Sequence, residues 1–152
     1  MKYWSALLIL ATCLWMGCGS EDECSGEEPT LMEFIEDQNF TGLQTFAMGL
    51  DTFQYIILAE GDQSRRPSLS NQILVNYTGR LTNNEIFDQG NGVPLSLDRV
   101  IRGWQNGLQL IGEGGAIQLF LPPSQAYGPA GARSICPNTP LYFEVELLEL
   151  IN

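Results

Sequence analysis

Histidine is absent from the 152 residues of this chain. Nucleophilic catalysis by Ser-His-Asp or Cys-His arrangements needs an imidazole, and so does a metal site with histidine ligands. The composition therefore excludes these kinds of site, and we expect neither a metal nor a cofactor.

Basic residues are scarce, because 7 lysines and arginines stand against 18 acidic residues and leave a formal net charge of −11. A chain with this charge has little attraction for phosphate backbones, so nucleic acid is not an expected partner. Solubility is a sufficient explanation of the acidic surface. With 44% apolar residues, the chain can still build the core of one domain of ordinary size.

An apolar run long enough to span a bilayer permanently is also lacking. The run that follows Lys2 is interrupted at Gly17-Cys18, which is too early for such a helix. A basic residue followed by a short apolar run is typical of a secretory signal peptide. We therefore expect a signal peptide over residues 1–17.

The dipeptide Gly17-Cys18 resembles the lipobox of bacterial lipoproteins, in which cleavage leaves the cysteine as a lipidated N-terminus. This resemblance predicts lipidation of Cys18 and a lipid-anchored protein of the bacterial cell envelope, on the periplasmic or surface face of the outer membrane. Acyl chains would hold it at the membrane, because an acidic protein gains nothing from anionic headgroups. The alternative is an ordinary signal peptide cleaved near Gly19 or Ser20.

Residues 18–30 are rich in Asp and Glu among Gly, Ser and Pro, which predicts an acidic flexible tether. Residues 31–50 are predicted to form an N-terminal helical appendage. Thr30 is a candidate N-cap, and the apolar residues after it recur at helical spacing. We expect a short amphipathic helix over 31–39 that docks on the domain.

Two cysteines remain if Cys13 leaves with the signal peptide and Cys18 is lipidated. These are Cys24 and Cys136, and an exported protein occupies a compartment where disulfides persist. Cys24 lies on the predicted tether, however, so a bond would depend on geometry that the sequence does not supply. We expect the two to remain unpaired.

The rest of the chain, 51–152, is predicted to be a single α+β domain. Alternation of apolar and polar residues favours strands, while apolar residues at helical intervals in Arg102 to Ile111 favour one short helix. Strands outnumber helices, and turns join most neighbours. This pattern predicts an antiparallel twisted β-sheet wrapped around that helix. The expected strands include Thr52 to Leu58, Ile73 to Thr78, the segment with Ile86 and Phe87, Ala116 to Leu121, and Leu141 to Leu150.

Five short blocks carry a family resemblance over roughly the last two-thirds of the chain. They are Val75–Gly79, Phe87-Asp88, Val100–Trp104, Ala126–Gly128 and Phe143–Leu148. Their order and spacing resemble those of the FKBP-type peptidyl-prolyl isomerases. The resemblance implies that family's fold, which agrees with the α+β prediction.

The resemblance also implies a set of site residues. The implied catalytic residues are Tyr77, Phe87, Asp88, Ile101, Trp104, Tyr127 and Phe143, and the implied substrate-binding residues are Val100, Ile135, Leu95 and Val93. Val93 and Leu95 stand where the family commonly has aromatic residues, so one wall is less aromatic. For Asp88 the sequence leaves two partners open, the Tyr77 hydroxyl and Arg102.

These residues offer no activated nucleophile, and their chemistry is that of a small apolar pocket. Rotation about an Xaa-Pro bond meets a barrier of about 20 kcal/mol, because the planar amide gives up its resonance. A dry cavity favours the less polar twisted amide relative to water. Trp104 has the size of a floor for the proline ring, and Tyr127 or the Ile101 N–H can hold a substrate carbonyl.

The sequence therefore predicts a prolyl cis-trans isomerase that acts on proline-containing polypeptides, exported or of the envelope, and assists their folding. The alternative is a low-activity FKBP-like peptide-binding or chaperone module anchored at the envelope. A third reading is a structural envelope lipoprotein without turnover or peptide binding. We expect a monomer.

Overall fold

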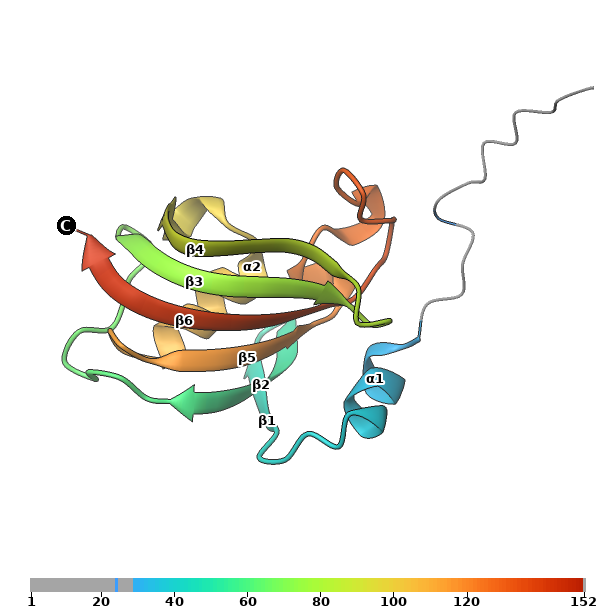
Figure 1. Ribbon diagram of the computed structural model, residues 1–152, viewed down its shortest axis with the longest axis horizontal. Helices are drawn as coiled ribbons and strands as arrows, with labels where there is room; N and C mark the ends of the chain where they lie inside the picture. Colours follow the sequence, from blue (N-terminus) through green and yellow to red (C-terminus); the bar gives the residue numbers. More distant parts are fainter. Residues whose placement is uncertain (1–23, 25–28, 152) are drawn as a thin grey trace, which may run out of the picture.

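A single six-stranded sheet organises the computed structural model, which describes residues 24 and 29–151 (Figure 1). All neighbouring strands are antiparallel, and their order is β1-β2-β5-β6-β3-β4. The strands are β1 (Gln44–Met48), β2 (Asp51–Ala59), β3 (Gln72–Leu81), β4 (Ile86–Ser96), β5 (Ala116–Leu121) and β6 (Leu141–Ile151). The predicted α+β class and the antiparallel sheet around one short helix are confirmed.

Two α-helices and four short 3-10 helices accompany the sheet within these residues. They are α1 (Leu31–Asp37), α2 (Arg102–Gly107), η1 (Leu97–Arg99), η2 (Leu108–Leu110), η3 (Pro123–Gln125) and η4 (Gly128–Ala130). The predicted helix from Arg102 to Ile111 is thus α2 continued by the 3-10 turn η2. No helix of the described chain is both long and apolar enough to cross a bilayer.

Helix α2 packs directly on β5, and two glycines make this close approach possible. A Cβ at Gly103 would lie 2.3 Å from a methyl group of Leu121, and one at Gly107 would lie 2.6 Å from a methyl group of Leu119. Both leucines are fully buried. The sheet and α2 thereby enclose the main core, which also contains Ile73, Val75, Leu97, Leu108, Ile111, Ile117 and Leu147.

Successive strand residues point to opposite sides of a sheet, so alternate residues of β5 and β6 face away from α2. Helix α1 covers this second face. Phe34 and Ile35 of α1 pack with Phe120 and Tyr142 in a second buried cluster. The helix begins where the sequence predicts. The hydroxyl of Thr30 accepts a hydrogen bond from the Glu33 N–H at 3.3 Å, and the Thr30 N–H donates to the Glu33 carboxylate at 2.7 Å. This capping box stabilises a helix of only 7 residues.

Residues 31–50 were predicted to form a helical appendage that contains a short helix, and α1 occupies only the first part of this segment. Strand β1 occupies the end of this segment and pairs with β2. The rings of Phe46 and Phe53 stack across the pair at 4.7 Å between centroids. Because β1 is an edge strand whose only half-buried residue is Phe46, it lacks the alternation that reveals an inner strand. The division of the chain at residue 51 stays a prediction.

The prediction that Cys24 and Cys136 stay unpaired is wrong. They form a disulfide with 5.5 Å between Cα atoms across a sequence separation of 112 residues. Cys24, Pro29 and Thr30 lie beside the loop between β5 and β6, and only the folded structure supplies this proximity. The rest of the predicted tether (18–23 and 25–28), the predicted signal peptide and Cys18 lie outside the described residues.

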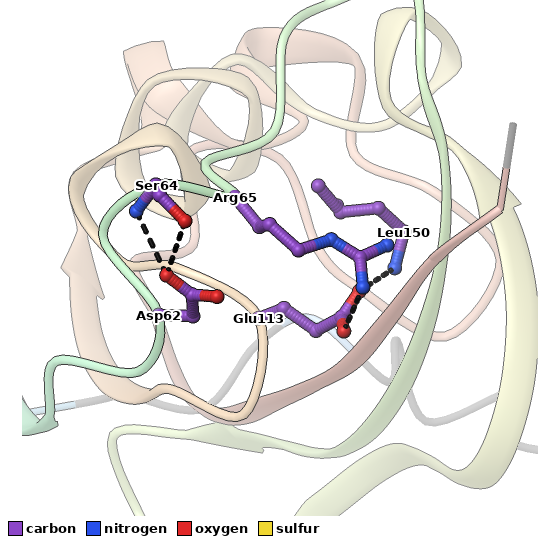
Figure 2. Close-up of polar contacts among 5 residues, drawn as sticks. All are labelled: Asp62, Ser64, Arg65, Glu113 and Leu150. Carbon is purple, nitrogen blue, oxygen red and sulfur yellow. Dashed lines mark hydrogen bonds and ion pairs between the residues drawn. The ribbon is translucent and has the colours of Figure 1, made fainter.

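The connection between β2 and β3 is fastened by polar contacts (Figure 2). The Arg65 guanidinium meets one Glu113 carboxylate oxygen at 2.6 Å, and the Leu150 N–H donates to the other at 2.8 Å. Nearby, the N–H and hydroxyl of Ser64 both donate to Asp62. Glu113 therefore joins this connection to the end of β6.

Candidate active site

A hollow of about 230 Å³ opens between the sheet and the N-terminal end of α2. Strands β3, β4 and β6 contribute to it, together with the junction between η1 and α2 and the loop after η3. We call it the main hollow. Its lining consists of Tyr77, Asp88, Leu95, Arg99, Val100, Ile101, Trp104, Tyr127 and Phe143.

Trp104 lies at the base of the main hollow with 4% of its surface exposed. Its ring meets Tyr77 and Phe143 edge to face, each at 5.3 Å between centroids. Phe143 in turn meets Phe87 edge to face at 5.5 Å. Edge-to-face contacts of this kind hold aromatic rings in fixed orientations. The indole N–H is buried and has no hydrogen-bond partner within the described chain.

Both carboxylate oxygens of Asp88 accept hydrogen bonds. The Tyr77 hydroxyl donates to Oδ2 at 2.9 Å, and the Gln89 N–H donates to Oδ1 at 2.9 Å. Of the two partners that the sequence left open, Tyr77 is therefore the one observed. Arg102 lies instead 3.7 Å from Asp51.

The acidity of Tyr77 is set by this environment. Burial, the hydrogen bond to Asp88 and the nearby charges of Asp88 and Tyr127 raise the pKa of Tyr77 to about 12. Its hydroxyl therefore stays protonated across the physiological range and keeps donating to Asp88. The pair is a fixed polar group at the wall of the main hollow.

Tyr127 presents a hydroxyl that makes no hydrogen bond within the described chain, and 38% of its surface is exposed. Burial and the charge of Asp88 raise its pKa, while the charge of Arg133 opposes them. The loop that carries Tyr127 is anchored by Gln125, which is 1% exposed and donates to the Asp51 carboxylate at 2.8 Å. This anchor holds the Tyr127 hydroxyl at the opening.

A second free donor is the backbone N–H of Ile101. Ile101 is the N-cap of α2, and its carbonyl accepts from Trp104 and Gln105, whereas its N–H has no partner within the described residues. The Gln105 side chain stabilises the preceding turn by donating to the Val100 carbonyl at 2.9 Å and the Asp98 carbonyl at 3.2 Å. The turn is thereby fixed with the Ile101 N–H uncommitted.

An adjoining hollow of about 370 Å³ shares the lining residues Asp88 and Tyr127 with the main hollow. Phe87 and Ile135 line this adjoining hollow, together with Arg133. Val93 lines neither hollow, and its side chain lies beside Gly90. The structure thus brings together all the sequence-implied site residues except Val93.

Several residues at the site escaped the sequence analysis. Arg99 lines the main hollow, and Gln105 and Gln125 position its donors. Arg99 immediately precedes the block Val100–Trp104, and an exposed arginine carries no signal of its own in a single sequence. Gln125 directly precedes Ala126–Gly128, but a buried glutamine cannot be told from a loop residue without the fold.

Other concave regions offer less chemistry. A hollow of about 430 Å³ beside the Cys24–Cys136 disulfide is lined by five prolines among eleven residues, and no lining side chain is titratable, because both cysteines are in the disulfide. Among residues 24 and 29–151, no three His, Cys, Asp or Glu side chains gather as a metal ion requires. The main hollow remains the place where apolar walls and free donors converge.

Comparisons with known proteins agree on one family. The family model described as FKBP-type peptidyl-prolyl cis-trans isomerase matches residues 63–148. The chain is 42% identical over 113 residues to the FKBP-type peptidyl-prolyl cis-trans isomerase FkpA of Escherichia coli, covering 72% of this chain and 40% of that protein. It is 37% identical over 119 residues to the peptidyl-prolyl cis-trans isomerase Mip of Coxiella burnetii, covering 75% and 50%. The chain thus spans about half or less of these relatives.

Solved structures show the same similarity. The crystal structure of FkpA from Escherichia coli matches with a TM-score of 0.68 at 36% identity, covering 77% of this chain and 55% of that one. A peptidyl-prolyl cis-trans isomerase from Pseudomonas syringae pv. tomato matches with a TM-score of 0.67 at 31% identity, covering 84% of this chain and 100% of that one. The second match extends over the whole of a solved chain.

Proposed function

The chain belongs to the family of FKBP-type peptidyl-prolyl cis-trans isomerases, and from this premise we propose that it catalyses the rotation of Xaa-Pro bonds. One observation carries the proposal. Trp104 forms the base of a hollow walled by Tyr77 and Phe143. The Ile101 N–H and the Tyr127 hydroxyl border it, and neither has a partner among the described residues.

The barrier to rotation arises from the loss of amide resonance and is about 18–20 kcal/mol. A planar amide has greater charge separation than the twisted amide, so water stabilises the planar forms more. Transfer into a hollow of aromatic and aliphatic side chains removes this advantage. Interactions that favour the transition state over the ground state lower the barrier without a covalent step.

Each lining group has a proposed role in this scheme. Trp104 supports the proline ring, and Tyr77, Phe87 and Phe143 exclude water around it. The Ile101 N–H and the Tyr127 hydroxyl bind substrate carbonyls and hold the peptide while the amide turns. Asp88 positions Tyr77 by accepting its hydrogen bond. Val100, Leu95 and Ile135 complete the apolar wall, and Val93 contributes only through its contact near Gly90.

We place this activity at the bacterial cell envelope, with the protein held by a lipid on Cys18 and acting as a monomer on exported polypeptides. The motif Gly17-Cys18 supports the anchor. The Cys24–Cys136 disulfide supports an oxidising compartment, because such bonds persist outside the cytosol. Palmitate labelling of the native chain and not of Cys18→Ser is the expected result. Equal labelling of both would exclude this anchor.

A low-activity peptide-binding or chaperone module is the alternative, and the aliphatic Leu95 in the wall favours it. A protease-coupled assay with Xaa-Pro-Phe peptides separates the two functions. We expect turnover by the native chain and a marked loss in Asp88→Val. Saturable peptide binding without turnover would support the module instead, and neither binding nor turnover would exclude both.

A further inference from the structure

Six arginines carry all the side-chain positive charge of residues 24 and 29–151. Four of them are engaged within the fold: Arg65 with Glu113, Arg66 with Gln63, Arg80 with the Asn84 carbonyl and Arg102 with Asp51. The other two, Arg99 and Arg133, form no hydrogen bond or ion pair within that part of the chain. Both are exposed, and both border the site.

The two free arginines line different hollows of the site. Arg99 lines the main hollow, and Arg133 lines the adjoining hollow. The charge of Arg133 acts on the site directly, since it lowers the pKa of Tyr127 against the effect of burial. A peptide held over Trp104 would therefore meet a guanidinium where it passes Arg99 in the main hollow or Arg133 in the adjoining one.

Within the described residues, Asp88 forms no ion pair with Arg99 or Arg133. It is the one carboxylate in the lining of both hollows, and its oxygens accept hydrogen bonds from Tyr77 and Gln89. Because neither guanidinium has a partner in the described chain, both keep their donors for a ligand. Guanidinium groups with free donors bind carboxylates with charge-assisted hydrogen bonds.

The backbone of Arg133 gives an independent reason to assign it a role outside the fold. Ala132 and Ile135 exchange hydrogen bonds of 2.9 and 2.7 Å across a two-residue turn, and Arg133 occupies the first turn position with φ of 49°. Glycine or asparagine is favoured at such a position. An arginine there carries a conformational cost that no contact of its side chain offsets within the described fold.

We infer that Arg99 and Arg133 make this site selective for Xaa-Pro segments with an acidic residue directly before or after the proline. This inference rests on the proposed isomerase function. It names the substrate class, because the two guanidinium groups would receive carboxylates that flank the proline held over Trp104.

The acidic character of the rest of the molecule determines how the inference must be tested. At an ionic strength of about 0.15 M the Debye length is about 8 Å, so distant carboxylates are screened more strongly than an arginine in contact with the peptide. At about 1 M it falls to about 3 Å and the contact itself is weakened. Selectivity should therefore be present at the lower of these ionic strengths and decline at the higher one.

The experiment measures cis–trans exchange by NMR, without a helper protease that has charge preferences of its own. Two peptide pairs are compared, Ac-Ala-Glu-Pro-Phe-NH2 with its Gln analogue, and Ac-Ala-Leu-Pro-Glu-NH2 with its Gln analogue. Because exposed ion pairs are weak, we expect kcat/KM for Glu to exceed that for Gln by about two- to fivefold in at least one pair. The ratio should approach one at the higher ionic strength.

Arg99→Gln and Arg133→Gln test the assignment, and Arg66→Gln is the matched control. Arg66 is exposed and lines neither hollow, so its replacement changes the net charge equally without touching the site. We expect at least one of the first two variants to lose the preference for Glu while Arg66→Gln retains it. Equal rates for Glu and Gln in both pairs, or a preference that survives both site variants, would overturn the inference. Failure of every peptide to turn over would instead overturn the isomerase function, and the selectivity with it.

Discussion

The sheet carries an aromatic cluster on each face, and the rings of the two clusters are spaced alike. On the face toward α1, Phe34, Phe40, Phe120 and Tyr142 lie 4.8 to 5.8 Å apart between ring centroids. On the face toward α2, Tyr77, Phe87, Trp104 and Phe143 lie 5.3 to 5.5 Å apart. Aromatic content and ring spacing therefore do not distinguish a site from a core.

The two clusters differ in whether a helix covers them and in whether hydrogen-bond donors beside them lack partners. Helix α1 seals the first cluster, where the Tyr142 hydroxyl is hydrogen-bonded with Glu144 and Gln118. The second cluster is left open at its edge, and the Tyr127 hydroxyl and Ile101 N–H beside it have no partner in the described chain. We conclude that the sealed face stabilises the molecule and propose that the open face binds substrate.

The largest expected effect comes from truncating the sealed face. Phe120 is fully buried, and Phe120→Ala should lower the free energy of unfolding by about 3–5 kcal/mol. Because Phe120 lies on the face of the sheet away from Trp104, kcat/KM per folded molecule should not change. Urea unfolding and the exchange assay check the two halves of this prediction. A large fall in kcat/KM would show that the two faces are coupled.

The disulfide links Cys24, which precedes α1 on the sealed face, to the loop that carries Ile135 at the open face. It therefore joins the two faces under comparison. Replacing both Cys24 and Cys136 with serine should lower the free energy of unfolding by about 2–4 kcal/mol, chiefly by freeing the unfolded chain. Urea midpoints of the oxidised native chain and the double variant give the difference. Identical midpoints would mean that the disulfide does not contribute to the free energy of unfolding.

On the open face, removing one hydroxyl should affect rate and not stability. Tyr127→Phe loses a donor that makes no internal hydrogen bond, so kcat/KM should fall by about two- to tenfold, the factor of one hydrogen bond. The matched control is Tyr55→Phe, which removes the hydroxyl that donates to Gln44 at 3.0 Å, away from both hollows. Equal effects of the two variants on kcat/KM would remove Tyr127 from the binding role.

The smallest effect concerns the alkaline range. The pKa of Tyr77 is raised from 10.0 to about 12, so the folded chain holds this proton more tightly than the unfolded chain. The stabilising contribution is complete below pH 10 and is lost as the pH rises toward 12. Burial also raises the pKa of Tyr142 on the sealed face.

Spectrophotometric titration of the phenolates should therefore show three late-ionising tyrosines, Tyr77, Tyr127 and Tyr142, of which one is removed by Tyr77→Phe and one by Tyr142→Phe. Urea midpoints should decline less steeply between pH 10 and 12 in either variant than in the native chain. A Tyr77 that titrates near 10 would contradict its hydrogen bond to Asp88.

Much of the fold was predictable from local patterns. The alternation of Ile73, Val75 and Tyr77 revealed β3, the helical spacing of Trp104, Leu108 and Ile111 revealed α2 with its 3-10 extension, and Thr30 marked the start of α1. Each of these signals lies within a few residues of chain. They survive because tertiary packing agrees with local preference.

The features that were missed depend on contacts between distant parts of the chain. Strand β1 is defined by its pairing with β2, the disulfide by a proximity across 112 residues, and the anchoring of the Tyr127 loop by Gln125 and Asp51. At the site, the family blocks identified the apolar lining. They did not indicate Arg99, whose importance follows only from its place beside the main hollow and from its having no partner in the part of the chain that the structure describes.

The most direct test of this account is the effect of Trp104→Leu on kcat/KM for an Xaa-Pro peptide, measured by NMR exchange at a temperature where the variant remains folded. Leucine keeps an apolar group at the base of the main hollow and removes the flat indole that supports the proline ring. We predict a loss of at least about tenfold, equivalent to about 1.4 kcal/mol of transition-state stabilisation. A folded variant with native kcat/KM would contradict the claim that the hollow above Trp104 performs the rotation.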